Sequence, residues 1–395
     1  MDSNESSPTL TASTWTGTVT PATSISSSTT LALPTIPLGP LPVTTLSANS
    51  WRTLYPQIGQ FAMTTSEEVV AAGSRGLFYF KRVRDHGSTP WSEARPLPST
   101  QAMLNNSSVS GLAIHRSKSR LDVYCVSSGV LHSFYCSTDA GSSFVVNPRP
   151  PLSTHLVRGS PAVVNTGVRY NSEGRWNLVV PCQSGGLLHT STTGPSSRGY
   201  YSSDKEWEPV DHVAKELGLI SAVSITTTQI RGGDEYYGRP KRIDIVAACV
   251  ASARLHTLEG KFSQEHSSWK WEAQTSTRIY HPGEVTGNPV LVTKTETNQL
   301  DLLVPSAEGG VFHFVRTEST PDEWHMIARI TFPPGLPAAS CLAFNSALNN
   351  WENQRQFSAL VQSGGRLYQI RTYEGAHPWY GSCLKPIVAP GPFSD

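Results

Sequence analysis

Short apolar runs recur along most of this 395-residue chain, and each is bounded by Gly, Pro or Ser/Thr-rich stretches. Helical periodicity is scarce. Runs of this length, separated by turn-forming residues, are typical of β-strands. The pattern therefore predicts an all-β protein, and the chain is long enough to bury a large core.

A four-residue signature recurs six times and ends in His or Tyr. The intervals between copies run from about 53 to 67 residues, and an aromatic-containing strand follows each copy. The signature positions are Tyr79, His132, His189, His256, His313 and Tyr368. The aromatic residues that follow are Trp91, Phe144, Trp207, Trp269 or Trp271, Trp324 and Trp379.

Two further strands precede each signature, so each unit has four strands. The strand just before the signature covers 67–73, 120–126, 176–182, 242–248, 299–305 and 356–362. The small-residue-rich strand ahead of it covers 59–65, 111–117, 161–167, 221–227, 289–295 and 341–347. A four-stranded sheet cannot bury both of its faces alone, so the units must stack, and closing them radially protects their edges.

The repeat thus predicts a six-bladed β-propeller of four-stranded antiparallel blades over residues 46–395. The small residues of the first strand suit the crowded axis. The predicted blades are approximately 52–100, 101–154, 155–212, 213–276, 277–333 and 334–390.

Residues 1–45 form a Ser/Thr/Pro-rich leader that we expect to be disordered. The leader has no basic n-region and no apolar h-region, so a secretory signal is not predicted. A cytoplasmic location is favoured over secretion, although the sequons at Asn105 and Asn106 suit a secreted protein equally well. The sequence leaves the oligomeric state open.

The amino-acid composition argues against several classes of binding partner. The net charge is +1 and only 15% of residues are charged, so no basic face for nucleic acid is predicted. No apolar run approaches the ~20 residues of a membrane helix. The six cysteines form no CxxC pair, which favours buried free thiols over a metal site. No nucleotide-binding or cofactor motif is present, so we predict no cofactor.

The His/Tyr column invites comparison with a metal ring. Strands of a blade are spaced by about 4.7–4.9 Å, so third strands lie well away from the axis. Histidines of different blades therefore cannot converge on one ion. We interpret the column as a repeated packing and hydrogen-bonding position.

Residues 137–144, STDAGSSF, resemble the Asp-box of sialidase-type propellers. In that motif the Asp, here Asp139, closes a tight turn, and the Gly, here Gly141, takes the special backbone dihedral. The motif occurs once and supports the fold. A sialidase would also need an arginine cluster and a Tyr/Glu nucleophile pair, which no motif places here, so glycosidase activity stays a minor alternative.

Three arginines follow the signature by three residues: Arg82, Arg316 and Arg371. On these residues, and over about residues 52–385, the repeat resembles the six-bladed fungal fucose-specific lectins. In that family each site uses an arginine, a carboxylate and a stacking tryptophan. The other blades carry Tyr135, Thr192 and Glu259 in place of the arginine, and no carboxylate recurs at a fixed offset. The resemblance implies sugar binding between blades as one function.

The loops between blades differ sharply, unlike the strands. In propellers such loops line one mouth of the central cavity, so their polar residues are candidates for one asymmetric pocket. We predict catalytic roles for Arg158, Tyr280, His281 and Glu284, and substrate-binding roles for His155, Tyr55, Asn106 and Arg278.

The length, the leader and the lectin-like blades also resemble the fungal hetero-Diels–Alderases of tropolone–sesquiterpenoid (meroterpenoid) biosynthesis. This resemblance implies a cofactor-independent enzyme of secondary metabolism that joins an ortho-quinone methide to a humulene-type sesquiterpene. Its small hydrophobic substrates would gather in an apolar pocket, where proximity lowers the barrier and donors stabilise the charge growing on oxygen. We take this pericyclase as the main functional hypothesis and the lectin as the alternative.

Overall fold

The fold is described from a computed structural model. Met1–Ala32 and Leu33–Asp395 form two separate units, and the propeller belongs to the second. The structure describes residues 35–37, 59–73, 76–82, 91–92, 94–97, 100, 104, 108–117, 120–137, 144–147, 150–166, 175–192, 207–230, 242–263, 268–273, 283–294, 297–321, 323–332, 336–349, 354–373 and 385–386.

Six antiparallel sheets follow one another along the chain, and each contains four consecutive strands. Blade 1 consists of β2 (Phe61–Met63), β3 (Glu68–Gly73), β4 (Gly76–Lys81) and β5 (Arg95–Pro96). Blade 2 consists of β6 (Val109–Arg116), β7 (Arg120–Ser127), β8 (Val130–Ser137) and β9 (Val145–Val146). Blade 3 consists of β10 (Ala162–Asn165), β11 (Trp176–Pro181), β12 (Leu187–Ser191) and β13 (Asp211–Val213).

Blade 4 consists of β14 (Ile220–Ile230), β15 (Arg242–Ala251), β16 (Arg254–Ser263) and β17 (Ser268–Ala273). Blade 5 consists of β18 (Val290–Lys294), β19 (Gln299–Pro305), β20 (Val311–Arg316) and β21 (His325–Thr331). Blade 6 consists of β22 (Cys341–Asn349), β23 (Gln354–Ser363), β24 (Arg366–Tyr373) and β25 (Lys385–Pro386). One short 3-10 helix, η1 (Lys215–Leu217), joins blades 3 and 4.

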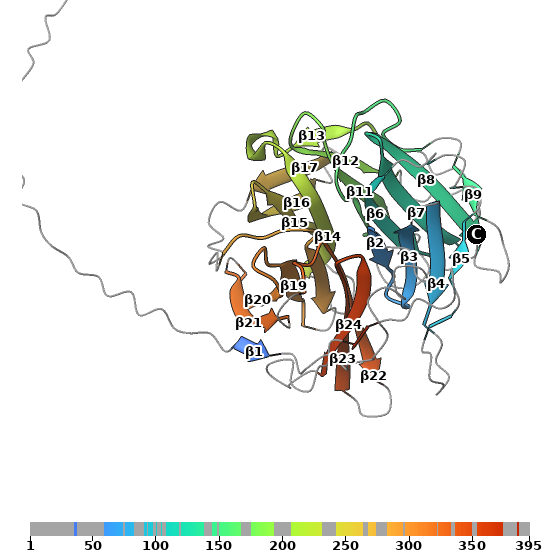
Figure 1. The fold of residues 1–395 in the computed structure, drawn as a ribbon. Helices are drawn as coiled ribbons and strands as arrows, with labels where there is room; N and C mark the ends of the chain where they lie inside the picture. Colours follow the sequence, from blue (N-terminus) through green and yellow to red (C-terminus); the bar gives the residue numbers. More distant parts are fainter. Residues whose placement is uncertain are drawn as a thin grey trace, which may run out of the picture. The chain divides into compact units, whose positions relative to one another are not determined.

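The first strands of the six blades form a closed ring. Each contacts the first strand of the next blade, and β22 of the last blade contacts β2 of the first. Figure 1 shows the sheets arranged around this ring. At the closure, Phe61 of blade 1 packs in one core cluster with Cys341 of blade 6. The predicted six-bladed, four-stranded propeller is confirmed.

One strand lies in the predicted leader. β1 (Thr35–Pro37) pairs in parallel with β21, so the sheet of blade 5 has five strands. It lies beside β21 at the edge of the propeller (Figure 1). The rest of the predicted leader lies outside the described residues, and its disorder stays a prediction.

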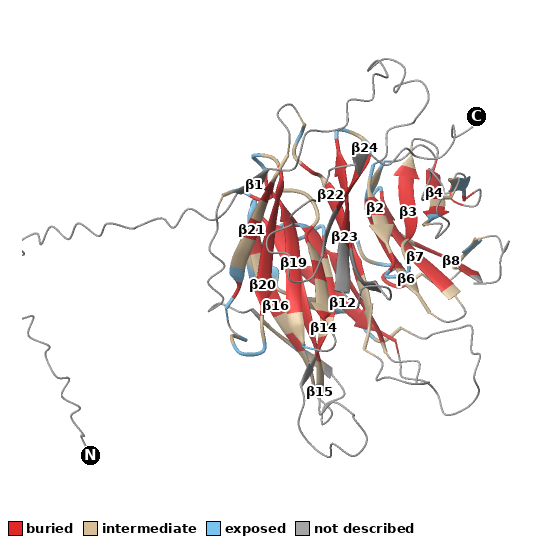
Figure 2. Cartoon of the chain, turned by 90° about the horizontal axis from the view of Figure 1, so that it is seen from below, coloured by how far each residue is buried: buried red, intermediate tan, exposed pale blue. Residues whose placement is uncertain are grey.

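Apolar side chains fill the spaces between neighbouring blades. One cluster, for example, joins Val246 of blade 4 to Leu302 and Phe312 of blade 5. Figure 2 shows the strands buried along most of their length. Burial of this area is the main favourable contribution to folding. The five cysteines within the described residues are free and buried, as the sequence predicted, whereas Cys383 lies outside them.

The strand order gives the propeller two distinct ends. We call the end of the propeller at which the first strands begin the Gln60 face. The hairpins between second and third strands lie at this same end. We call the opposite end, at which the first and third strands finish and the second and fourth strands begin, the Arg116 face. Loops from one blade to the next therefore lie on the Gln60 face. No helix within the described residues is long and apolar enough to cross a membrane.

Polar side chains of alternate blades meet across the axis on the Gln60 face. The amide oxygen of Gln60 in blade 1 accepts hydrogen bonds from Asn288 of blade 5, at 2.7 Å, and from Ser160 of blade 3, at 3.4 Å. Blades 1, 3 and 5 alternate around the ring, so these bonds span the axis.

Close backbone contacts between blades at this face require glycine. Gly159 has φ +60°, and a Cβ there would lie 2.0 Å from the carbonyl oxygen of Ser221 in blade 4. Gly309 also has a left-handed φ, +98°, but a Cβ there would meet nothing within 4 Å. Alanine at either position would be strained by the positive φ, but only alanine at position 159 would also clash with the neighbouring blade.

We predict that Gly159→Ala lowers the free energy of unfolding by about 2 kcal/mol more than Gly309→Ala does, because only the first substitution forces two blades apart. Chemical denaturation of both variants measures the difference. Equal losses would contradict a tight contact between blades 3 and 4.

Candidate functional site

A buried polar side chain occupies the same position in the second strand of every blade. These side chains are Glu68, Asp122, Asn177, Asp244, Asp301 and Ser358. The register places one polar third-strand residue diagonally beside each of them, on the same side of the sheet: Tyr79, Ser133, His189, Glu259, His313 and Gln369. Every blade therefore has a polar pair between its second and third strands.

Hydrogen bonds join this pair in four blades. Tyr79 donates to Glu68 at 2.7 Å, and Gln369 donates to Ser358 at 2.7 Å. The ring Nε2 of His189 lies 3.1 Å from Asn177 Oδ1. The equivalent bond in blade 5 joins His313 to Asp301 at 2.9 Å. The hydrogen-bonding interpretation of the His/Tyr column is confirmed at Tyr79, His189 and His313.

The column was misaligned in the other three blades. The register pairs His132 with Cys125, His256 with Cys249 and Tyr368 with Val361, which puts these side chains on the other side of the sheet from the polar residue. Two-residue turns join the second and third strands in these blades, whereas five-residue loops do so in blades 3 and 5. Blade 1 also has a two-residue turn, but its signature residue lies an odd number of residues after Glu68, which returns Tyr79 to the polar side. An odd difference in loop length shifts the strand by one residue and reverses its faces.

Arginine–carboxylate pairs gather on the Arg116 face, because second strands begin and third strands finish there. Two of the described pairs join neighbouring blades: Arg116–Glu68 joins blades 2 and 1, and Arg316–Glu259 joins blades 5 and 4. The described pairs on this face are Arg82–Glu67 (2.6 Å), Arg116–Glu68, Arg120–Asp122 (2.6 Å), Arg175–Glu208 (2.9 Å) and Arg316–Glu259 (2.9 Å).

The predicted sugar-binding residue Arg316 has both partners of a lectin-type group. Its Nη1 donates to Glu259 of the neighbouring blade, and its guanidinium carbon lies 5.4 Å from the ring centroid of Trp324. The carboxylate is thus contributed by another blade, which is why no fixed sequence offset revealed it. The arginine and the ring of this group are closed to solvent, since the Arg316 side chain is 7% exposed and Trp324 is 3% exposed, whereas the Glu259 side chain is 21% exposed.

The other two predicted sugar-binding arginines differ. Arg82 forms its ion pair with Glu67 and bridges to the buried Trp91 of the fourth strand. Arg371 lies in β24 opposite Ser358, and its side chain lies outside the described residues. None of the predicted three therefore presents an accessible tryptophan in the described part of the chain.

An accessible group lies between blades 3 and 4, and the sequence analysis missed it. Arg175, just before β11, donates to Glu208 at 2.9 Å and lies 4.8 Å from the ring centroid of Phe262 in blade 4. Phe262 contacts Trp269 at 5.3 Å between ring centroids. The Arg175 and Glu208 side chains are 29% and 24% exposed, and Phe262 and Trp269 are half-buried.

Arg175 lies ahead of the second strand of blade 3 and Glu208 lies ahead of the fourth, so this group does not follow the signature offset. The sequence analysis considered arginines three residues after the signature, and Arg175 instead precedes the signature of its blade.

His189 anchors the inner side of this group. Trp271 Nε1–H donates to His189 Nδ1 at 3.3 Å, and Nε2 faces Asn177. Trp269 and Trp271 both stand edge-on to the ring, with centroids at 5.7 and 5.2 Å. Burial lowers the pKa of His189 to about 3, so the ring is neutral and holds the aromatic cluster in place.

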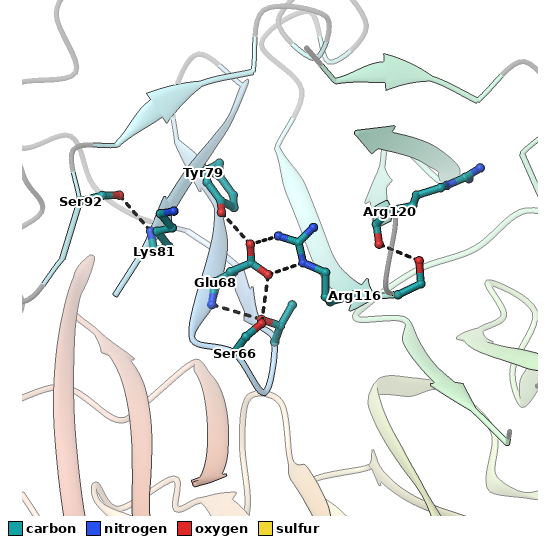
Figure 3. A network of polar contacts seen from close by, with 9 residues as sticks. Ser66, Glu68, Tyr79, Lys81, Ser92, Arg116 and Arg120 are labelled. Atoms are coloured by element: carbon teal, nitrogen blue, oxygen red, sulfur yellow. Dashed lines mark hydrogen bonds and ion pairs between the residues drawn. The ribbon is translucent and has the colours of Figure 1, made fainter. Parts of the chain in front are cut away.

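A third group lies between blades 1 and 2. Figure 3 shows the Glu68 carboxylate between the Tyr79 hydroxyl and the Arg116 guanidinium, which extends from blade 2. Arg116 uses Nε, at 2.7 Å, and Nη2 to hold the two oxygens, and Ser66 donates to one of them at 3.1 Å. Burial alone would raise the pKa of Glu68, but the bonds from Arg116 and Tyr79 outweigh it and lower the pKa.

The residues predicted to form a catalytic pocket are not brought together with these groups. Arg158 and Glu284 lie in loops on the Gln60 face, as does His155, whose Nδ1 lies 3.2 Å from Thr154 Oγ1. The Gln60 bonds cross the axis at the same face. Their catalytic and binding roles stay predictions.

The remaining predicted residues lie outside the described residues, so the structure does not place them. They are Tyr55, Asn106, Arg278, Tyr280 and His281, together with Asp139 and Gly141 of the Asp-box.

Neither a family model nor a curated protein matches the chain. Solved structures share its fold. A mutant of the Aleuria aurantia lectin, in complex with alpha-methyl-L-fucoside, superposes with a TM-score of 0.51 at 14% identity, over 82% of this chain and 95% of that one.

Two further solved structures share the fold. The BP39L lectin from Burkholderia pseudomallei gives a TM-score of 0.51 at 14% identity, over 82% of this chain and 81% of that one. A triple arginine-to-alanine mutant of AofleA from Arthrobotrys oligospora gives 0.53 at 9% identity, covering 85% and 87%. At these identities the likeness shows the fold.

The neutral His189 makes stability depend on pH. Its pKa in the folded protein is about 3, below the 6.5 of an exposed histidine, so its contribution is complete above pH 6.5 and is lost as pH falls toward 3. Between pH 7.5 and 5, we expect the wild type to lose about 2 kcal/mol relative to His189→Gln.

Denaturant titrations at the two pH values measure this loss. The exposed His325, replaced in the same way, serves as the control. A parallel pH dependence of the wild type and His189→Gln would contradict a buried neutral ring.

Proposed function

We propose that this protein binds carbohydrate, and that its accessible site is the boundary between blades 3 and 4 on the Arg116 face. The observation that carries the proposal is the Arg175–Glu208 ion pair beside the half-buried rings of Phe262 and Trp269. The site lies between two blades, where the sequence resemblance to fucose-specific lectins implies sugar binding.

The chemistry of the group suits a sugar. A pyranose has an apolar face, which stacks on an aromatic ring, and a rim of hydroxyls. The Arg175 guanidinium donates to hydroxyl oxygens, and the Glu208 carboxylate accepts from hydroxyl hydrogens. Hydrogen bonds to charged groups are about twice as strong as neutral ones, and their geometry selects the hydroxyl arrangement.

Charge pairing favours a neutral sugar. Arg175 is already bonded to Glu208, so the pair adds little net positive charge to the site. An acidic sugar would face the Glu208 carboxylate without an unpaired cation to offset it. The lectin neighbour crystallised with alpha-methyl-L-fucoside makes that neutral sugar the first ligand to test.

The Arg175 group differs from the Arg316 group in how far its arginine and its aromatic rings are exposed. Trp324 beside Arg316 is buried, so a sugar has no ring face to stack on, and the pair serves to join blades 4 and 5. We therefore expect fewer sugar sites than blades, with the site between blades 3 and 4 binding most tightly.

The cycloaddition and the sialidase-like hydrolysis stay predictions from the sequence. The cycloaddition was assigned to Arg158, Tyr280, His281 and Glu284. Of these, Arg158 and Glu284 fall within the described residues, half-buried and exposed respectively, on the Gln60 face. The described contacts do not join Arg158 to Glu284, so they do not favour a shared active site over sugar binding.

Calorimetric titration of the full chain with methyl α-L-fucoside, preceded by a glycan array to choose the best neutral sugar, tests the proposal. We expect saturable binding that weakens about tenfold or more in Arg175→Lys and in Glu208→Gln, since each removes a charged hydrogen bond. The matched control Arg316→Lys should bind as the wild type does.

Two results would contradict the proposal in different ways. If no neutral glycan binds saturably, the function is wrong. If binding is lost in Arg316→Lys and kept in Arg175→Lys, the function stands and the site is wrong.

A further inference from the structure

The fourth strand of each blade is the outer edge of its sheet, and these edges differ in length. The fourth strands of blades 1, 2, 3 and 6 have two or three residues each. The two longer ones are β17 of blade 4, with six residues, and β21 of blade 5, with seven. A long edge strand presents backbone N–H and C=O groups that can pair with a second molecule, so these two edges need protection.

Charged side chains protect the edge of β17. The Lys270 side chain in this strand is 77% exposed, and Glu272 binds both Lys270 and Lys261 at 3.0 Å. Charges on an edge strand, lysine above all, oppose pairing because they would lose their hydration. The sequence of β21, HMIARIT, has no lysine and no carboxylate, and its one arginine, Arg329, is held by Glu308 at 2.7 Å. Charge therefore protects β21 much less.

A β-bulge protects the first part of β21. The partners of two consecutive residues of β20 are Ala328 and Met326, so Ile327 is an extra residue in β21. A bulge bends the strand and interrupts the regular spacing of its backbone groups, which blunts an edge. Beyond the bulge, residues 328–331 pair with β20 in regular register. This regular stretch is the part of the edge that could still accept a strand.

β1 covers this regular stretch. Thr35 lies opposite Arg329 and Pro37 opposite Thr331, in parallel register, so β1 pairs with three of the four residues. Figure 1 shows β1 beside β21 at the edge of the propeller. The bulge and β1 thus each protect one part of the same strand.

The composition of β1 prevents it from extending the sheet further. Proline has no backbone N–H, and Pro34 and Pro37 enclose the segment, so Thr35 and Ile36 carry its only donors. Successive N–H groups of a strand point to opposite sides, so one of these two faces β21 and the other faces away. A strand with a single outward donor is a poor template for another strand, and proline is confined to sheet edges for the same reason.

We propose that the outer edge of β21 is a strand-addition site whose occupant is the chain's own Thr35–Pro37 segment, and that this segment keeps the edge from pairing with the same edge of a second copy. Because the segment belongs to the same chain, it competes with a second copy at a roughly millimolar effective concentration. Two uncovered edges would instead join the blades of two copies into one sheet about a two-fold axis. This role does not depend on the sugar site.

Thr35→Pro/Ile36→Pro in the full chain removes both donors of the segment. The matched control, Thr44→Pro/Thr45→Pro, changes two leader residues outside β1 in the same way. In dilute protein, hydrogen exchange of a peptide covering β21 should become faster in the first variant only. Sedimentation velocity over a range of protein concentrations should show that variant self-associating at concentrations at least about tenfold lower than the wild type and the control.

A disulfide tests which copy supplies the segment. Pro37→Cys/Thr331→Cys places two thiols on paired residues of neighbouring strands, where their Cα atoms are close enough for a bond. Mild oxidation should link the two cysteines within one monomer. The absence of a link, or a link found only between two copies, would overturn the proposal.

The proline variant gives two further ways to be wrong. Unchanged exchange of β21 in that variant would overturn the pairing with β1, and faster exchange without a change in self-association would overturn the protective role. Sugar binding should be the same in both proline variants, which separates a failure here from a failure of the carbohydrate site.

Discussion

The closed ring of first strands is the constraint on which the other features of this propeller depend. Six first strands contact one another around the axis, and the last meets the first through Cys341 and Phe61, whose carbonyl oxygen lies 3.3 Å from the thiol. Closing the ring buries both faces of every sheet and leaves only outer strands as edges. It also fixes which ends of the strands face each other across a blade boundary.

That geometry directs charged residues to one end of the molecule. Because every second strand begins and every third strand finishes on the Arg116 face, arginines and carboxylates there reach across blade boundaries. The Arg316 side chain is buried in its pair with Glu259, and this pair joins blades 4 and 5. The pairs at Arg175 and Arg116 remain partly exposed, and their environments differ. Arginine–carboxylate pairs at different places in the repeated unit thus differ in exposure from one blade to the next.

The sequence was sufficient for the architecture because strand length, turn residues and the third-strand signature repeat in all six units. It was insufficient for register. His132 and His189 occupy the same place in the signature, but hairpins of different length put their side chains on opposite sides of the sheet. It was also insufficient for partners: Glu259 lies 57 residues from Arg316 and belongs to another blade. Contacts between blades follow the ring and not the local spacing.

The accessible arginine–carboxylate–aromatic group between blades 3 and 4 is the central claim. A crystal structure of the full chain soaked with methyl α-L-fucoside, or with the best neutral sugar found, tests it most directly. We predict that the sugar lies on Phe262 and Trp269 with its hydroxyls on Arg175 and Glu208. A sugar bound instead on the Gln60 face, or beside Arg316, would contradict this account.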